Sequence, residues 1–390
     1  MINITLFSQI ISKLDRSKFN KLTLSQGSDK HNKGYNSWTH LVSMLFCQFA
    51  KSQSVRDISN GLRSATGNLN HMGITKVPSK SSVSYQNKHR DHNLFKDYYF
   101  CLLESLGQQA GFKQVKFRIK SKIFLLDSTT ISLGLSLFDW AKYKTAKGAI
   151  KMYTLLDYDG NLPAYVNITN GKTADNRGAY KVPLVKWSVI VADRFYNDFY
   201  LLNIWDSKGV FFVIRHKENL QYISKGEITL PQNRHQNIMI DELIELKNLA
   251  SKEKYGKKLR RVAVWDEQNK QTIELITNQM SWTANTISKL YKTRWQIEIF
   301  FREIKQNLHI KSFVGTTENA VMIQIWTALI TILILKALKA MAKYKWHLSN
   351  LVAFIRLNIF VKINLQQWLD KPFDEPPPTM PNSCTQGIIF

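Results

Sequence analysis

The stretch from Tyr291 to Lys305 places one carboxylate among cations and a phenol on a single helical face. At 100° per residue, five polar side chains fall within a stripe about 80° wide: Tyr291, Arg294, Glu298, Arg302 and Lys305. The neighbouring stripe is apolar and predicts burial against a core. Ordinary i, i+4 ion pairs on a solvated face explain Glu298 and its arginines, but not three cations beside one acid. A helix that brings a metal-binding acid to a phosphate backbone needs this composition.

Two further acids follow apolar runs that we predict to be buried strands. Asp127 comes directly after Ile123–Leu126, and Asp193 comes directly after Val189–Ala192. Carboxylates at strand ends, joined by Glu298 from a packed helix, can hold a pair of hard divalent cations. Two such ions activate the attacking oxygen of a phosphodiester cleavage and stabilise the leaving oxygen. An aspartate after a strand is more often a turn residue, so the two aspartates alone predict no site.

Four residues spaced Y-x2-R-x3-E-x6-K resemble the signature of the insertion-sequence-4 family of transposases: Tyr291, Arg294, Glu298 and Lys305. These enzymes are DDE recombinases with a ribonuclease-H-like fold. The stretch Asp127-Ser-Thr-Thr is similar to the first acidic region of that family. The stretch Val191-Ala-Asp193-Arg-Phe-Tyr is similar to the second. The resemblance extends over nearly the whole chain.

The resemblance implies a metal-holding triad of Asp127, Asp193 and Glu298, with two Mg²⁺ (or Mn²⁺) ions as cofactors. It also implies that four side chains of the signature helix grip the phosphate next to the scissile bond: Tyr291, Arg294, Arg302 and Lys305. A studied branch of the family holds a flipped base on a tryptophan in the strand before this helix. The corresponding run here, Thr272–Thr277, contains no tryptophan, so the sequence departs from the family pattern there.

Two more cations stand at the start of a region with several β-type runs. Arg215 and Lys217 are predicted to contact the DNA backbone, although ordinary surface charge has the same pattern. His216 between them, and His309 farther along, are predicted to face solvent or DNA rather than to bind a metal.

Net charge points to a large polyanionic partner. The 390 residues contain 54 Lys and Arg against 29 Asp and Glu, a formal net charge of +25. This excess favours nucleic acid, or a membrane surface, over small neutral metabolites. The cysteines form no CxxC pair, which excludes a cysteine zinc site. The longest apolar run, Val321–Met341, is interrupted by Gln324 and Lys336. We therefore predict a buried core helix, no membrane contact and a cytoplasmic location.

The first hundred or so residues have helical periodicity. A short helix capped by Ser54 is predicted to end at Gly61 or Gly67, and a basic helix is predicted to open at Ser79 or Ser81. A short helix, a turn and a polar basic helix are the pattern of a helix-turn-helix DNA reader. A plain helical bundle with a basic face has the same pattern, so both interpretations stay open.

Strand periodicity begins near residue 117. Ser128–Leu133 is predicted as the hairpin partner of the strand before it, and one helix is predicted from about Ala284 to Leu308. The predicted fold is an α/β ribonuclease-H-like catalytic core interrupted by a β-rich insertion, with an N-terminal all-α DNA-binding domain and a helical C-terminal segment. The predicted parts are the N-terminal domain (1–112), the first core part (113–205), the insertion (206–280), the second core part (281–345) and the C-terminal segment (346–390).

These features predict a DNA transposase that binds the terminal inverted repeats of an insertion sequence and catalyses metal-dependent strand cleavage and strand transfer. Its partner is double-stranded DNA, at the transposon ends and the target. The active complex is predicted to be a homodimer, because two ends are held at once. The alternatives are a metal-dependent nuclease of the same fold without strand transfer, and a non-catalytic DNA-binding regulator. Three retained acids disfavour the regulator, because buried carboxylates facing phosphates do not help a pure binder.

Overall fold

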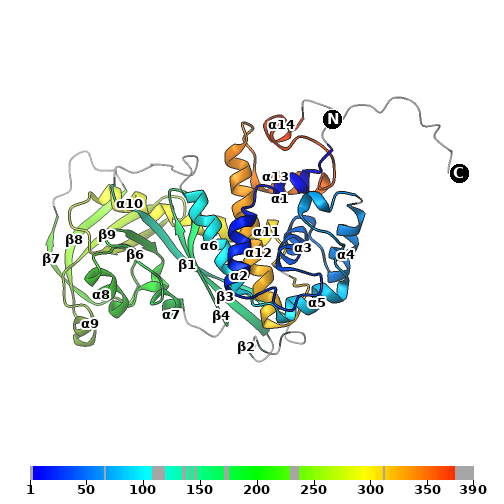
Figure 1. The fold of residues 1–390 in the computed structure, drawn as a ribbon. Helices are drawn as coiled ribbons and strands as arrows, with labels where there is room; N and C mark the ends of the chain where they lie inside the picture. The colour runs from blue at the N-terminus through cyan, green and yellow to red at the C-terminus, as the bar shows by residue number, and fades with distance from the viewer. Residues whose placement is uncertain are drawn as a thin grey trace. The chain divides into compact units, whose positions relative to one another are not determined.

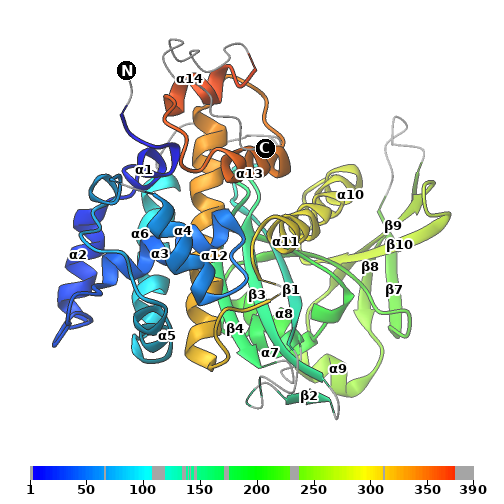
Figure 2. The ribbon, with the colours of Figure 1, turned by 90° about the vertical axis from the view of Figure 1, so that its right-hand side faces the viewer.

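The computed structural model describes residues 3–65, 67–107, 119–133, 138, 140, 142–144, 147–170, 175–228, 237–310 and 312–373. The chain divides into two compact units (Figures 1 and 2). Unit 1 contains Met1–Leu106 and Ile304–Phe390, and unit 2 contains Gly107–Glu303. The predicted boundary between residues 112 and 113, and residues 374–390 of the predicted C-terminal segment, lie outside the described residues.

Unit 2 is built on one mixed sheet. Among the described residues ten strands form it, in the order β2-β3-β1-β5-β6-β10-β9-β8-β7, with β4 paired to β3. The strands are β1 (Ile123–Leu133), β2 (Lys142–Lys144), β3 (Lys147–Asp157), β4 (Leu162–Asn170), β5 (Val189–Ala192), β6 (Phe211–Arg215), β7 (Tyr222–Glu227), β8 (Ile238–Leu246), β9 (Leu259–Asp266) and β10 (Gln271–Thr277). Residues 206–280, predicted as an insertion, supply β6 to β10, and these strands extend the same sheet rather than forming one of their own.

Strand β1 joins the antiparallel and parallel parts of the sheet. It pairs antiparallel with β3 and parallel with β5, and β5 pairs parallel with β6. The predicted hairpin was wrong, because Ser128–Leu133 continues β1 and pairs with β3. The first four residues of β1 are all buried, whereas its last residues alternate between buried and exposed. This change from a two-sided to a one-sided core made one strand look like two.

Different helices cover the two faces of the sheet (Figure 2). The helices of unit 2 are α7 (Asp175–Ala179), the 3-10 turn η4 (Arg194–Tyr196), α8 (Phe199–Ser207), α9 (Leu249–Lys254), α10 (Ala284–Thr293) and most of α11 (Trp295–Asn307). Even-numbered core residues of β1, β5 and β6, such as Leu126, Ala192 and Phe212, pack with Trp205 of α8. Side chains alternate along a strand, so the odd-numbered residues point to the face that α10 covers.

The helix predicted from Ala284 to Leu308 is two helices that meet at Arg294. The Arg294 N–H donates to the Tyr291 carbonyl at 3.0 Å, and the Ile297 N–H donates to the Arg294 carbonyl at 3.1 Å. These bonds reach back three residues and tighten the turn. Arg294 still has helical angles, φ −51° and ψ −33°, so the polar stripe continues across the junction.

Unit 1 is helical. Its helices are α1 (Leu6–Ile11), α2 (Arg16–Ser25), α3 (Ser37–Ala50), α4 (Val55–Ser64), the 3-10 turn η1 (Asn70–Met72), α5 (Lys80–His89), α6 (Asn93–Gly107), α12 (Glu318–Met341), α13 (Leu348–Leu357) and α14 (Leu365–Asp370). Helix α12 contacts α3, α5, α13 and α14. By length and composition it is the one described helix that could cross a membrane, but 83% of its most apolar window is buried. It is therefore the core helix that the interrupted apolar run predicts.

Two predicted helix starts are confirmed and one predicted end was wrong. Ser54 caps α4, and Ser79 caps α5. Helix α4 ends at neither Gly61 nor Gly67 but at Ser64. A Cβ at Gly61 would lie 2.4 Å from the Phe46 ring. The glycine therefore permits close packing of α4 on α3 and does not terminate the helix.

Candidate active site

The sheet register brings the two aspartates to adjacent positions. Leu126 of β1 pairs with Ala192 of β5 in parallel, so Asp127 and Asp193 follow side by side on strands spaced about 4.8 Å apart. Both are odd-numbered positions and point to the face covered by α10. Asp193 directly follows β5 and caps η4, where its carboxylate accepts from the Phe195 N–H at 2.7 Å. Asp127 was predicted to end its strand but lies within β1.

Arg294 connects the third acid to the first. Glu298 lies in the first turn of α11, and its carboxylate accepts from Nη2 of Arg294 at 2.7 Å. The other guanidinium nitrogen, Nη1, lies 3.8 Å from the Asp127 carboxylate. The side chains of Arg294, Asp127 and Glu298 are 18%, 20% and 33% exposed. The arginine therefore stands between two half-buried acids, one from the sheet and one from the helix.

The carboxylates form one electrostatic cluster. Burial first of all, and then the nearby charges of Asp193 and Glu298, raises the pKa of Asp127 to about 7. The Ser128 N–H and Arg294 act in the opposite direction but only in part. Burial alone would lower the pKa of Arg294, yet its anionic neighbours raise it. The cluster therefore carries more negative charge than its one arginine compensates.

Tyr291 and Arg215 border this cluster. The Arg294 guanidinium lies 5.9 Å from the centre of the Tyr291 ring. Burial raises the pKa of Tyr291, with further effects from Arg294, Asp193 and Arg215. Ala192 also pairs with Ile214 of β6, so Arg215 continues the row of Asp127 and Asp193. Sequence reasoning missed this placement, because only the β5–β6 register reveals it.

The remaining predicted DNA-binding residues lie elsewhere. Lys217 is exposed and lines a separate cleft of about 490 Å³ with Asn248 and Lys254. Arg302 is exposed and Lys305 half-buried, and they lie about one and two helical turns beyond Glu298 on α11. The structure thus gathers Tyr291, Arg294 and Arg215 around the acids, and it does not bring Lys217 there.

The predicted exposure of both histidines was wrong. His216 is 8% exposed, and its Nε2 contacts the Glu274 carboxylate while Nδ1 lies 2.5 Å from the Lys217 carbonyl. His309 is 6% exposed and contacts Ser312. Neither faces solvent, because flanking cations in the sequence do not reveal which side of the chain a histidine occupies.

The donor chemistry of the acidic cluster fits a hard divalent cation. Carboxylate oxygens are the ligands that Mg²⁺ prefers in proteins, and excess negative charge around Asp127 is what such an ion relieves. In the described part of the chain, no three His, Cys, Asp or Glu side chains already stand close enough together to ligate one ion. Arg294 occupies the position between Asp127 and Glu298, so its guanidinium serves as their cationic partner.

Comparisons with known proteins show what this chain is similar to. Residues 118–334 match the family model described as a transposase DDE domain, and residues 2–75 match a domain of unknown function, DUF4372. A Geobacillus stearothermophilus protein named as a transposase for insertion sequence element IS5377 is 27% identical, over 71% of this chain and 72% of its own. A Sinorhizobium fredii protein named as transposase y4zB is 31% identical, over 60% and 66%. A piggyBac transposase synaptic complex with hairpin DNA covers 91% of this chain and 78% of its own, at 10% identity and a TM-score of 0.41.

Proposed function

This chain belongs to the transposase family with a DDE domain, and from that premise we propose that Asp127, Asp193 and Glu298 are the carboxylates at which it cleaves DNA. One observation carries the proposal: three acids far apart in the sequence form a single electrostatic cluster. Asp193 and Glu298 both raise the pKa of Asp127, and Arg294 bridges Asp127 and Glu298. A structural role for all three would leave this concentration of buried negative charge unexplained.

The three carboxylates would hold two Mg²⁺ (or Mn²⁺) ions, which supply the charge that activates the attacking oxygen of a phosphodiester and stabilises the leaving oxygen. With ions held by these acids, Arg294 would be available to bind the phosphate. Its planar fork of donors matches two phosphate oxygens. Tyr291 lies beside it with a raised pKa. The phenol therefore stays protonated at neutral pH and donates a hydrogen bond to the same phosphate.

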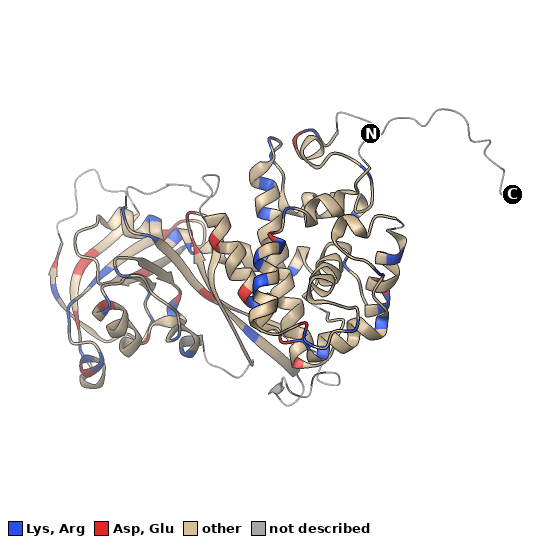
Figure 3. Cartoon of the chain, in the orientation of Figure 1, with Lys and Arg blue, Asp and Glu red and all other residues tan. Residues whose placement is uncertain are grey.

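The more distant cations would bind phosphates on either side of the scissile bond. Arg302 and Lys305 extend the basic stripe along α11, Arg215 extends the row of acids across the sheet, and Lys217 lies farther away. Lys and Arg occur on elements of each unit (Figure 3). A net charge of +25 supports broad contact with double-stranded DNA.

The substrates we assign are the terminal inverted repeats of an insertion sequence and its target DNA. The Geobacillus and Sinorhizobium relatives are both named as transposases. Strand transfer needs two transposon ends in one complex, and therefore at least two copies of the chain. We assign this activity to the cytoplasm. We assign β4, β3, β1, β5 and β6 with α10 and α11 to a ribonuclease-H-like core, and the helices of residues 1–112 to DNA binding.

The test is cleavage of end DNA with Mg²⁺ by paired variants of one helix. Glu298→Gln should lower the single-turnover rate by ~10³-fold or more, because several kcal/mol of metal-based stabilisation is lost. Glu303→Gln makes the same change five residues farther along α11 and should leave the rate unchanged. Asp127→Ala and Asp193→Ala should behave like Glu298→Gln while end binding, measured by gel shift, persists. A near-normal rate in any of the three removes that residue from the site.

Strand transfer separates the transposase from a nuclease of the same fold. Wild-type protein given cleaved ends and a target duplex should join the 3′-hydroxyl of the end to the target. Cleavage without any joined product would favour the nuclease.

A further inference from the structure

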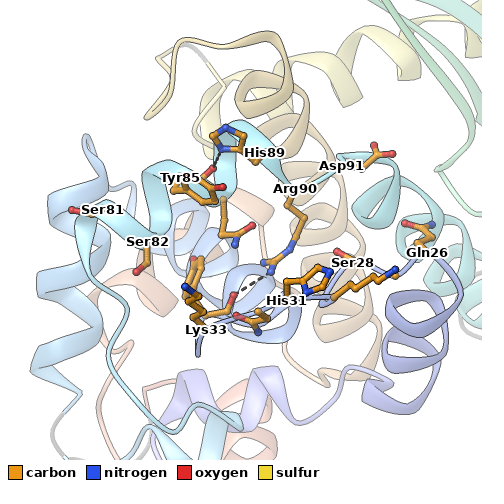
Figure 4. A pocket seen from close by; sticks show the side chains of 15 residues that line it. Gln26, Ser28, His31, Lys33, Ser81, Ser82, Tyr85, His89, Arg90 and Asp91 are labelled. Carbon is orange, nitrogen blue, oxygen red and sulfur yellow. Dashed lines mark hydrogen bonds between the residues drawn. The ribbon is translucent and has the colours of Figure 1, made fainter.

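Unit 1 contains a groove between the loop that follows α2 and helix α5. Its volume is about 1000 Å³, and it is lined by residues between 26 and 35 and between 81 and 91 (Figure 4). None of these residues belongs to the acidic cluster of unit 2. The groove has one wall from the loop and one wall from the helix that the sequence pattern marks as a possible DNA reader.

The loop wall is held in place by the half-buried carboxylate of Asp29. Oδ1 of Asp29 accepts from the Ser37 N–H and hydroxyl, both at 2.8 Å, and from Nη2 of Arg90 at 3.1 Å. Gly27 and Gly34 have φ of 61° and 107°, where a side chain is strained, so the chain can turn at both ends of the loop. The groove is therefore a built feature whose loop is tied to its helix.

Arg90 places an incompletely paired cation under the groove. Its side chain is 1% exposed and reaches from the end of α5 toward the loop that carries His31 and Lys33 (Figure 4). Nη2 donates to Asp29 and to the Tyr35 carbonyl at 3.1 Å, but Nε and Nη1 have no acceptor in the described part of the chain. A guanidinium has five N–H donors. A buried cation left this far from saturation favours an anion in the adjacent space.

The rim of the groove carries further cations and few acids. Lys30 and Lys33 line the groove and are exposed, and no carboxylate of the described residues forms an ion pair with either. Asp91 is the acid among the lining residues. Its carboxylate already accepts from the backbone and side-chain amides of Asn93 at 2.8 and 2.9 Å. The residues that line the groove therefore include more cations than acids.

An aromatic pair stands on the helix wall. The rings of Tyr85 and His89 are stacked, with centres 4.1 Å apart and planes at 25°. Nδ1 of His89 donates to the Tyr85 carbonyl at 2.8 Å. Tyr85 is 60% exposed, so the stacked pair is accessible from solvent. Cations beside an exposed flat ring favour nucleic acid over a simple anion.

We propose that this loop–α5 groove binds the phosphate backbone of DNA, with Lys30 and Lys33 as phosphate contacts and the Tyr85–His89 pair against the neighbouring nucleotide. Arg90 acts as a positioning residue that fixes the loop and supplies positive potential from below. The proposal deepens the proposed function, which assigns residues 1–112 to DNA binding, and it takes the DNA bound here to be the substrate of unit 2.

Salt dependence of binding tests the phosphate contacts. The full-length chain is titrated without Mg²⁺ onto a fluorescent duplex of mixed sequence at several salt concentrations. Lys30→Gln with Lys33→Gln should lower the slope of log K against log[salt] by about two, at ~0.9 per phosphate. Lys13→Gln with Lys21→Gln removes the same charge from exposed sites of unit 1 that do not line the groove, and it should leave the slope unchanged. Equal slopes in the two double variants would overturn the proposal.

The aromatic wall and the nature of the anion are tested separately. Tyr85→Ala should weaken duplex binding ~5-fold or more without changing the slope, because the ring contributes contact and no charge. Tyr85→Phe keeps the ring and should bind normally. Inorganic phosphate at matched ionic strength should not displace the duplex. Displacement by phosphate alone, or normal binding by Tyr85→Ala, would contradict a DNA groove.

These measurements do not depend on cleavage. If the acids of unit 2 were not catalytic, the binding slopes would stand as measured. If the lysine variants bound like wild type, the groove would be refuted and the cleavage tests at Glu298 would keep their meaning.

Discussion

Replacing Asp127 by asparagine should stabilise the metal-free protein at pH 8 and leave its stability unchanged at pH 4. The folded protein holds a proton on Asp127 up to about pH 7, whereas the unfolded chain releases it near the ordinary value of 3.8. Folded-state stability therefore falls as pH rises from about 4 to 7, and the full cost is present above 7. Asparagine has nearly the same shape and cannot ionise, so it avoids that cost.

The pKa sets the magnitude. Raising a pKa from 3.8 to about 7 corresponds to about 4 kcal/mol at 1.36 kcal/mol per pKa unit. The Asp127 side chain is 20% exposed, and Arg294 loses one carboxylate neighbour in the variant. We therefore expect a gain of roughly 2–4 kcal/mol at pH 8. In a unit of this size that gain raises the melting temperature by roughly 2–4 °C per kcal/mol.

The assay is thermal unfolding in EDTA at pH 4, 6 and 8. The wild-type and Asp127→Asn curves should nearly coincide at pH 4 and separate progressively toward pH 8. Asp157→Asn, on the neighbouring strand β3, should change stability by only about 0.5 kcal/mol at each pH. Adding Mg²⁺ should stabilise wild type and not Asp127→Asn, because the ion binds the native carboxylates. A difference at pH 8 no larger than at pH 4 would refute the assignment of Asp127 as a buried, crowded carboxylate.

Three further predictions concern residues around the site and the core. Arg294→Gln should fold normally but cut the cleavage rate by ~10²-fold or more. Arg294→Lys should recover only part of that rate, because a point charge cannot reproduce a bidentate fork. Single-turnover kinetics with a melting curve test this, and normal cleavage by Arg294→Gln would mean that the arginine only forms a structural ion pair. Arg215→Gln with Lys217→Gln should lower the salt slope of DNA binding by about two, and an unchanged slope would show that these side chains face solvent. Gly61→Ala should destabilise unit 1 by ~1–3 kcal/mol because its Cβ meets the Phe46 ring; a stabilised variant, the usual result for glycine inside a helix, would contradict the packing described.

The sequence was sufficient to predict the helical stripe that carries Arg294 and Glu298. Spacing along one helix is a local property, so the pairing of Arg294 with Glu298 follows from the i, i+4 relation alone. Apolar runs before Asp127 and Asp193 likewise marked two strands that the structure contains. What the sequence did not reveal was that β1 continues past Asp127, because burial of the strand changes from two faces to one at that point.

Long-range register and packing lay beyond sequence reasoning. The contact of Arg294 with Asp127 joins a helix to a strand far earlier in the chain, and the place of Arg215 depends on the pairing of β5 with β6. The ion pair between Asp29 and Arg90 in unit 1 likewise joins residues that are far apart in the sequence. Such contacts follow from how elements pack, and periodicity along one element carries no information about its partners.

Mapping the metal position within the protein tests the central claim most directly. Fe²⁺ bound in place of Mg²⁺, with ascorbate and peroxide, produces hydroxyl radicals that cut the backbone only near the ion. The proposed site predicts cuts in three segments, around Asp127, Asp193 and Glu298, which excess Mg²⁺ suppresses and which Asp193→Ala abolishes. Cuts confined to other segments, or unchanged cuts in the variant, would contradict a metal centre built from these three acids.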